Sequence, residues 1–208
     1  DSDNVNLPTS GSQDSPEVTA LADGGHLVVW MSQGSSNPDT SNYGIYAQRY
    51  DAAGAKVGSP VLVNTYTNSG QYYPSAAGLD DGSYVVTWQS SGQDGSGWGI
   101  YAQRFAANGT KTGGEALVTT TVANSQLESS VTALTGGGYA VTWRGYNAGT
   151  SSEDVYVRVF NASGVATTGE LLAVGIDVDA PGTTGFHTHH VDVENVRTVR
   201  LGFEPVNV

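Results

Sequence analysis

Apolar and polar residues alternate in short runs along most of this chain, and glycine-rich turns separate the runs. One kind of run ends in tryptophan: LVVW ends at Trp30, VVTW at Trp88 and AVTW at Trp143. A second kind follows each tryptophan and reads GIYAQRY over 44–50, GIYAQRF over 99–105 and DVYVRVF over 154–160. A period of two residues is typical of β-strands, so we expect a protein built of strands.

The runs recur three times in the same order, which predicts three tandem repeats. Asp-Gly or Gly-rich turns precede each tryptophan run at 22–25, 80–83 and 135–138, and such turns supply the positive φ of tight hairpins. Each unit therefore divides into four strands, joined as an antiparallel meander. We expect the units to span about 5–62, 63–117 and 118–173, within a repeat region of 1–173.

Both faces of the third strand carry bulky residues, as expected of a sheet packed between two neighbours. Tyr46, Gln48 and Tyr50 lie on one face and Ile45 and Ala47 on the other. The predicted fold is all-β, with three four-stranded antiparallel propeller-like blades; a β-prism-like arrangement is the alternative.

Residues 174–208 do not match the repeat, although two apolar runs in this segment look like strands. We interpret the segment as a divergent C-terminal β element that closes the fold or docks a partner. Propellers usually have four or more blades, so a homo-oligomer of two chains is another way to complete the ring.

Composition limits the classes of partner. The 208 residues carry a net charge of -12, which repels phosphate backbones and anionic lipid headgroups and attracts cations. No apolar run approaches the roughly 18 residues that span a bilayer, and there is no cysteine for a disulfide or a thiolate site. We expect neither nucleic-acid binding nor membrane insertion.

The repeat resembles one found in large secreted bacterial proteins, adhesin-like or hemolysin-type calcium-binding polypeptides of the RTX kind. The residues that carry this resemblance are VNTYTNSGQYYPS at 63–75 and LDDGSYVVTWQSSGQDGSGWGIYAQRF at 79–105. The resemblance implies a bacterial protein at an extracellular or cell-surface location. The nonapeptide calcium repeat of RTX proteins does not occur here, so the resemblance implies no calcium by that route.

The long loops after each tryptophan share one end of the meander with the segments between units, and long loops on a rigid scaffold often bind ligands. Aromatic faces stack on sugar rings, while amides and carboxylates bind hydroxyl groups, so this end suits a glycan or another cell-surface ligand. The alternative is that these residues only cap the sheets and form turns. The candidate ligand-binding residues are Asp39, Tyr43, Tyr72, Tyr73, Asp94, Trp98, Tyr146 and Asn147.

Two segments are candidate metal sites. Residues 93–97 could wrap a calcium ion with Asp94 and backbone oxygens, although the segment lacks the alternation of an EF-hand loop. The histidine cluster near the C-terminus could bind zinc or another transition metal, or could be a surface strand. The candidate ligands in this cluster are His187, His189, His190 and Asp192.

No catalytic motif stands out, since the chain has no Gly-x-Ser-x-Gly elbow, no cysteine nucleophile and no His-Glu-x-x-His. We therefore expect a non-enzymatic, extracellular binding or adhesion module that recognises its ligand through the long loops. One alternative is a structural or assembly domain without a small ligand. The other is a metal-dependent hydrolase that uses the C-terminal histidine cluster.

Overall fold

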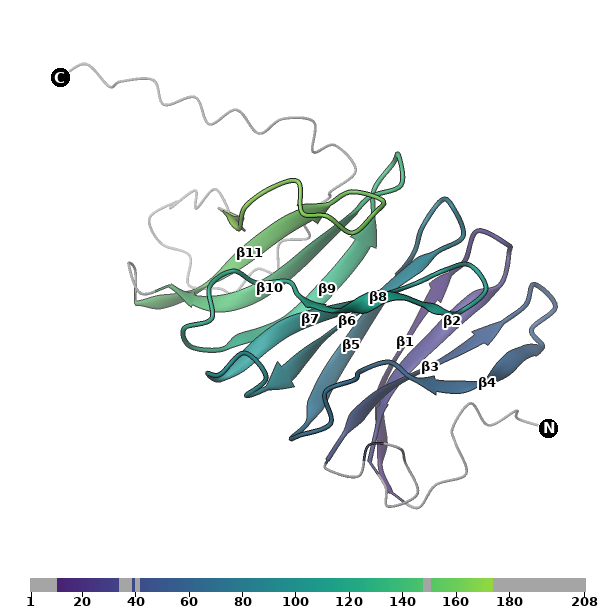
Figure 1. The fold of residues 1–208 in the computed structure, drawn as a ribbon, viewed down its shortest axis with the longest axis horizontal. Coiled ribbons are helices and arrows are strands. Elements are labelled where there is room, and N and C mark those ends of the chain that lie inside the picture. The colour runs from purple at the N-terminus through teal and green to yellow at the C-terminus, as the bar shows by residue number, and fades with distance from the viewer. Residues whose placement is uncertain (1–10, 34–38, 40–41, 148–150, 174–208) are drawn as a thin grey trace, which may run out of the picture. The chain divides into compact units, whose positions relative to one another are not determined.

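The computed structural model describes residues 11–33, 39, 42–147 and 151–173. The chain divides into two units, Asp1–Val174 and Gly175–Val208, and all the described residues lie in the first. They form strands and turns, with no helix that could span a membrane among them. Figure 1 shows three twisted sheets that follow one another along the chain.

Each sheet is a four-stranded antiparallel meander with its strands in sequence order, β1 to β4, β5 to β8 and β9 to β12. The strands are β1 (Gln13–Ala20), β2 (His26–Ser32), β3 (Gly44–Tyr50), β4 (Lys56–Leu62), β5 (Gln71–Gly78), β6 (Tyr84–Ser91), β7 (Trp98–Phe105), β8 (Lys111–Leu117), β9 (Gln126–Ala133), β10 (Tyr139–Asn147), β11 (Ser152–Phe160) and β12 (Leu171–Leu172). The prediction of an all-β protein with three four-stranded antiparallel sheets is confirmed. The C-terminal element predicted for 174–208 lies outside the described residues.

Short polar side chains form the hairpin turns at one end of the sheets. In the turn between β1 and β2, the Asp23 carboxylate accepts a hydrogen bond from the Gly25 amide at 3.0 Å, and Gly24 takes a φ of 82°. Asp23 also pairs with Arg49 of β3 at 3.0 Å. A residue with a side chain is strained at such a φ, which explains the glycine at this turn.

The sheets pack face to face through apolar side chains, and the repeated tryptophan has the same neighbour in each. Trp30, Trp88 and Trp143 stack on the tyrosine opposite them on the next strand, with ring centroids 6.1, 6.5 and 6.0 Å apart. Leu27, Val29 and Ile45 of the first sheet share a core with Tyr84, Val86 and Trp88 of the second. A second core of the same kind joins the second sheet to the third.

The first strands of the three sheets lie next to one another. The Glu17 carboxylate of β1 accepts hydrogen bonds from the Ser75 hydroxyl at 3.1 Å and the Ala76 amide at 3.3 Å, both on β5. The Ser75 hydroxyl in turn accepts one from the Val131 amide of β9 at 3.2 Å. We call β1, β5 and β9 the inner strands, because they hold the sheets together along a common edge.

Burial depends on whether a neighbouring sheet covers the position. Val18 of β1 is 64% exposed, whereas Ala76 and Val131 at the same position of the next two sheets are buried against the preceding sheet. On the opposite face, Ile45 and Ile100 are fully buried, whereas Val155 of β11 is 46% exposed. Val155 thus lies on a face of the third sheet that no other described sheet covers, whereas Trp30 and Tyr46, on the same face of the first sheet as Val18, are only 2% and 1% exposed. A second chain that completes a ring stays a prediction.

Candidate functional site

The long loops and the segments between sheets gather at the end of the sheets opposite the tight turns. This follows from the meander, in which alternate connections lie at the same end. The Gln71 amide at the start of β5 donates a hydrogen bond to the Tyr43 carbonyl before β3 at 2.8 Å, which joins the first two sheets at this end. The predicted gathering of these loops is therefore present where the structure describes them.

Four aromatic side chains meet here, and we call them the aromatic rim. The rings of Tyr43 and Tyr72 have centroids 5.3 Å apart, and the ring of Trp98 meets Tyr72 edge-on at 5.3 Å. Tyr73 lies 6.3 Å from Tyr72 and is 48% exposed. The rim thus brings together four of the eight predicted ligand-binding residues, from the residue before β3, the start of β7 and β5.

Each inner strand carries a β-bulge next to the rim, with a non-glycine residue at positive φ. Ser15, Tyr73 and Glu128 take φ values of 50°, 53° and 55°, and each stands fifteen residues before the tryptophan of its unit. The register shifts at the same place in all three inner strands. Bulges redirect side chains, and a non-glycine residue at positive φ is strained, so both features are typical of functional sites.

Two carboxylates lie at the bulges of β1 and β9, the inner strands on either side of β5. Asp14 of β1 accepts a hydrogen bond from the Tyr43 hydroxyl at 3.3 Å. Glu128 of β9 pairs with Arg144 at 3.0 Å, and its amide donates to the Gln89 side chain of the second sheet at 3.0 Å. Both residues are exposed.

Sequence reasoning missed these two carboxylates, although a signal was present. Asp14 aligns with Tyr72 and Glu128 with Tyr73 when the units are matched on their tryptophans. Every unit therefore places a residue able to contact a ligand at one of two adjacent positions, but the residue type changes from aromatic to acidic. The sequence alignment shows that these positions are equivalent, and the shared bulge shows that their backbones are alike.

Burial and hydrogen bonding affect the protonation of two groups near the inner strands. Burial, and to a lesser degree the neighbouring Tyr43 and Tyr73 hydroxyls, raises the pKa of Tyr72. Burial also raises the pKa of Glu17, and its hydrogen bonds from Ala76 and Ser75 oppose this rise only in part. Tyr72 is therefore a neutral hydrogen-bonding group in the rim, and Glu17 holds β5 against β1.

The two predicted aspartates are held inside the loops. Asp39 is completely buried, and its carboxylate accepts a hydrogen bond from the Asn64 side chain at 3.0 Å, so no surface is left for a ligand. Asp94 is partly buried, and one of its oxygens accepts the Ser96 amide at 2.9 Å, which forms the turn of loop 93–97. Both aspartates occupy the same position, five residues before the glycine near the start of the third strand.

The structure describes only one of the two predicted metal sites, the loop at 93–97. Within the described part of the chain, no three side chains of histidine, cysteine, aspartate or glutamate come together. His187, His189, His190 and Asp192 lie outside the described residues. Calcium in loop 93–97 and zinc at the histidine cluster stay predictions.

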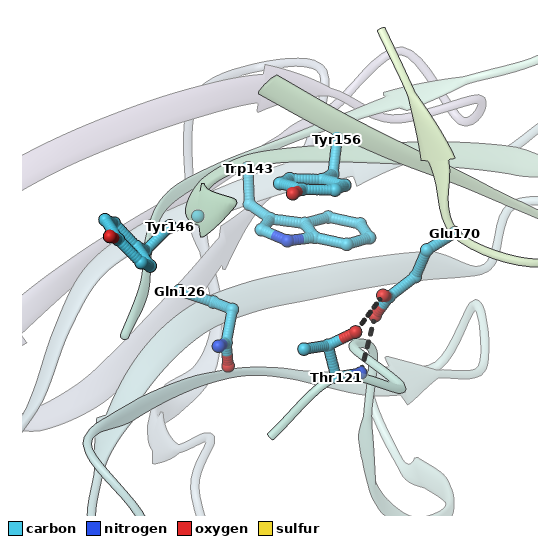
Figure 2. A pocket seen from close by; sticks show the side chains of 7 residues that line it. Thr121, Gln126, Trp143, Tyr146, Tyr156 and Glu170 are labelled. Carbon is cyan, nitrogen blue, oxygen red and sulfur yellow. Dashed lines mark hydrogen bonds between the residues drawn. The ribbon is translucent and has the colours of Figure 1, made fainter. Parts of the chain in front are cut away.

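The third sheet has a small open pocket at the same end, with a cavity volume of about 20 Å³, shown in Figure 2. Tyr146, 42% exposed, lies at its edge, and the stacked rings of Trp143 and Tyr156 form one wall. Asn147, the last residue of β10, pairs in register with Ser152. The other lining residues are Thr121, Gln126, Gly145 and Glu170.

Glu170 lines one side of this pocket, and both oxygens of its carboxylate accept hydrogen bonds. Its carboxylate accepts hydrogen bonds from the amides of Thr120 and Thr121 and from the Thr121 hydroxyl at 2.8 Å. Burial alone would raise the pKa of Glu170, but these hydrogen bonds together lower it. In the second sheet, Glu115 accepts the amides of Thr65 and Tyr66 in the same way. Tyr66 stands there at the position of Thr121.

No protein-family model matches the chain, and no curated protein matches its sequence. Solved structures do share its fold. The match to an alpha-L-arabinofuranosidase from Lactobacillus brevis covers 79% of this chain and 57% of the arabinofuranosidase chain, with a TM-score of 0.54 and 13% sequence identity. An endo-arabinase from Bacteroides thetaiotaomicron matches 80% and 65%, with a TM-score of 0.52 and 16% identity. The Hadza microbial sialidase matches 74% and 36%, with a TM-score of 0.57 and 10% identity.

The chain therefore spans between about a third and two thirds of the length of these structures. They correct several predictions made from the sequence. The resemblance to RTX and adhesin proteins is wrong, because the structures that share the fold carry the names of glycan-cleaving enzymes and no family model supports the resemblance. The association with calcium that characterises RTX proteins conflicts with the same neighbours.

The functional prediction needs the same correction. A non-enzymatic binding and adhesion module was expected because no catalytic motif is visible in the sequence. The neighbours named above point instead to an enzyme, and the prediction that the chain is not one is wrong. The lack of a motif is a weak argument against an enzyme, because the carboxyl groups used in glycoside hydrolysis are brought together in space and need not form a contiguous motif.

Proposed function

We propose that this chain supplies three sheets of a glycan-cleaving enzyme and that the glycan binds at the aromatic rim. The observation that carries the proposal is that the rim is centred on β5, the inner strand bonded to both β1 and β9, while Asp14 on β1 and Glu128 on β9 are exposed carboxylates at the equivalent bulges. The names of the structures that share the fold support the same chemistry. The ligand class is carbohydrate, and an extracellular location stays a prediction.

The rim has the side chains that sugar binding requires. Aromatic rings stack on the apolar faces of sugar rings, and Tyr73 is exposed enough to make such a contact. Glycoside hydrolysis generally uses two carboxyl groups, one to protonate the leaving oxygen and one to activate water or attack the sugar. We assign this pair to Asp14 and Glu128. The Tyr43 hydroxyl orients Asp14, and Arg144 orients Glu128.

The test is hydrolysis by the full chain of a panel of arabinan, aryl arabinofuranosides and aryl sialosides. We expect one of these substrates to be cleaved, and we expect Asp14→Asn and Glu128→Gln each to lower kcat by at least about 100-fold, the usual contribution of a general acid or base. Glu153→Gln is the matched control, because Glu153 also pairs with Arg144 but does not lie on an inner strand. Its kcat should stay within about twofold of the original.

Substitutions in the rim should affect binding more than chemistry. Tyr73→Ala and Trp98→Ala remove stacking surface, so KM should rise while kcat changes less. The proposal fails if the full chain cleaves no member of the panel. It also fails if a cleaved substrate is turned over equally well by Asp14→Asn and Glu128→Gln.

A further inference from the structure

The polypeptide passes from one sheet to the next at two junctions, and the first is held by a single asparagine. The Asn64 amide nitrogen donates to Asp39 Oδ2 at 3.0 Å, to the Tyr66 carbonyl at 3.0 Å and to Gln71 Oε1 at 3.1 Å. Its oxygen accepts the Ile45 amide at 2.8 Å. This buried nitrogen, with its two hydrogens, is therefore shared among three oxygens.

The second junction has the same oxygens but lacks this nitrogen. Thr119 occupies the position of Asn64, while Asp94 and Gln126 occupy those of Asp39 and Gln71. Asp94 Oδ2, Thr119 Oγ1 and Gln126 Oε1 are buried, and each lacks a hydrogen-bond partner. Thr119 and Gln126 are 2% and 3% exposed, so bulk water does not solvate them.

The backbone holds these oxygens in matching places at the two junctions. The side-chain nitrogen of Gln126 donates to the Asn124 carbonyl at 3.3 Å, and that of Gln71 donates to the Ser69 carbonyl at 3.2 Å. The Oε1 atoms of the two side chains therefore point in matching directions. Asp94 Oδ2 lies 2.7 Å from the place of a Cβ on Gly99, and Asp39 Oδ2 lies 3.2 Å from that on Gly44. The side-chain oxygens of Asp94, Thr119 and Gln126 therefore lie around the place that corresponds to the Asn64 side chain. The repeat puts the Thr121 carbonyl at the position of the Tyr66 carbonyl, which accepts from Asn64 in the first junction.

We propose that the second junction binds a monovalent cation between Asp94, Thr119, Gln126 and the Thr121 carbonyl. Leaving a buried oxygen without a partner costs free energy, and a cation would compensate the three side-chain oxygens together. The set holds one carboxylate and four oxygens, whereas calcium takes six to eight oxygen ligands and usually several carboxylates. A net charge of -12 adds a field that attracts cations.

The cation would link two parts of the molecule that matter for the rim. Asp94 belongs to loop 93–97, which leads directly into Trp98, and Gln126 opens the inner strand that carries Glu128. A bound cation would hold this loop against the third sheet. The inference does not depend on glycan cleavage, because it rests only on the comparison of the two junctions.

The test measures Tm of the full chain in sodium chloride, potassium chloride and choline chloride at equal ionic strength. Choline matches the screening but is too large for the site. We expect sodium or potassium to raise Tm by about 3–6 °C over choline, the shift that a ligand present at about ten times its Kd gives a chain of this size. Line broadening of the sodium resonance should report the same binding directly.

Thr119→Asn is the decisive variant, because it gives the second junction the side-chain amide that Asn64 provides in the first. It should remove the difference between the three salts while keeping the fold, as judged by circular dichroism. Thr119→Val, which removes one ligand and adds no amide, should weaken the salt-specific shift without abolishing it. Equal Tm values in all three salts would overturn the proposal and indicate a buried water, and so would a salt-specific shift that persists in Thr119→Asn.

Discussion

The second and third sheets share one repeat, yet their side chains have different surroundings. Ile100 in the second sheet is fully buried, whereas Val155 at the same position of the third is 46% exposed. Tyr66 in the segment before β5 is replaced by Thr121 before β9, where a pocket opens. Asn64 is replaced by Thr119, and the oxygens of Asp94 and Gln126 lack the donor that Asn64 provides in the first junction. The same backbone thus tolerates quite different environments, and the contacts with neighbouring sheets decide what each position does.

The largest expected difference between these sheets concerns the apolar position of the third strand. Ile100→Ala should lower the free energy of unfolding by about 2–5 kcal/mol, because it leaves a cavity between two packed sheets. Val155→Ala should lower it by no more than about 0.5 kcal/mol, as is usual for exposed positions. Urea unfolding of both variants provides the measurement. Equal losses would mean that Val155 is covered in solution.

A smaller difference in the free energy of unfolding is expected when the residues of the two junctions are exchanged. Asn64→Thr removes the donor from Asp39, Gln71 and the Tyr66 carbonyl and should cost about 1–3 kcal/mol, the usual penalty for leaving buried oxygens unpaired. Thr119→Asn supplies the missing donor and should gain about 1 kcal/mol in choline chloride, where no cation competes. Both values come from urea unfolding. A loss on Thr119→Asn would show that the second junction cannot accept the asparagine.

The smallest expected effect is the pH dependence that Glu170 gives to the third sheet. Its pKa is lower in the folded chain than in the unfolded chain, so the ionised carboxylate stabilises the fold above the unfolded pKa, and this stabilisation is lost as pH falls through the folded pKa. Glu170→Gln should therefore be less stable than the original chain near neutral pH. The difference should shrink as pH drops below about 4.5, the ordinary value for glutamate. Unfolding curves at several pH values test this, and a constant difference would contradict it.

The repeat made the fold predictable, because three copies of one pattern agree on strand number, order and turn positions. Tyr43, Tyr72, Tyr73 and Trp98 were also found, since loop residues at one end of a meander must lie near one another. Asp39 looked equally suitable but is fully buried, because the direction of a loop side chain depends on contacts with the next unit. Asp14 and Glu128 were missed because a bulge, which no residue type announces here, decides where they point.

The sequence by itself determined the strands, the turns and the antiparallel order, because these depend on local periodicity and on glycine and aspartate at the turns. Only the tertiary structure decided which faces are covered, which oxygens have partners and which carboxylates flank the rim. These properties arise between residues that are far apart along the chain, such as Glu17 and Ser75 or Asn64 and Asp39. Periodicity carries information about neighbours within one strand, whereas burial and pairing depend on what the adjacent sheet brings to the same place.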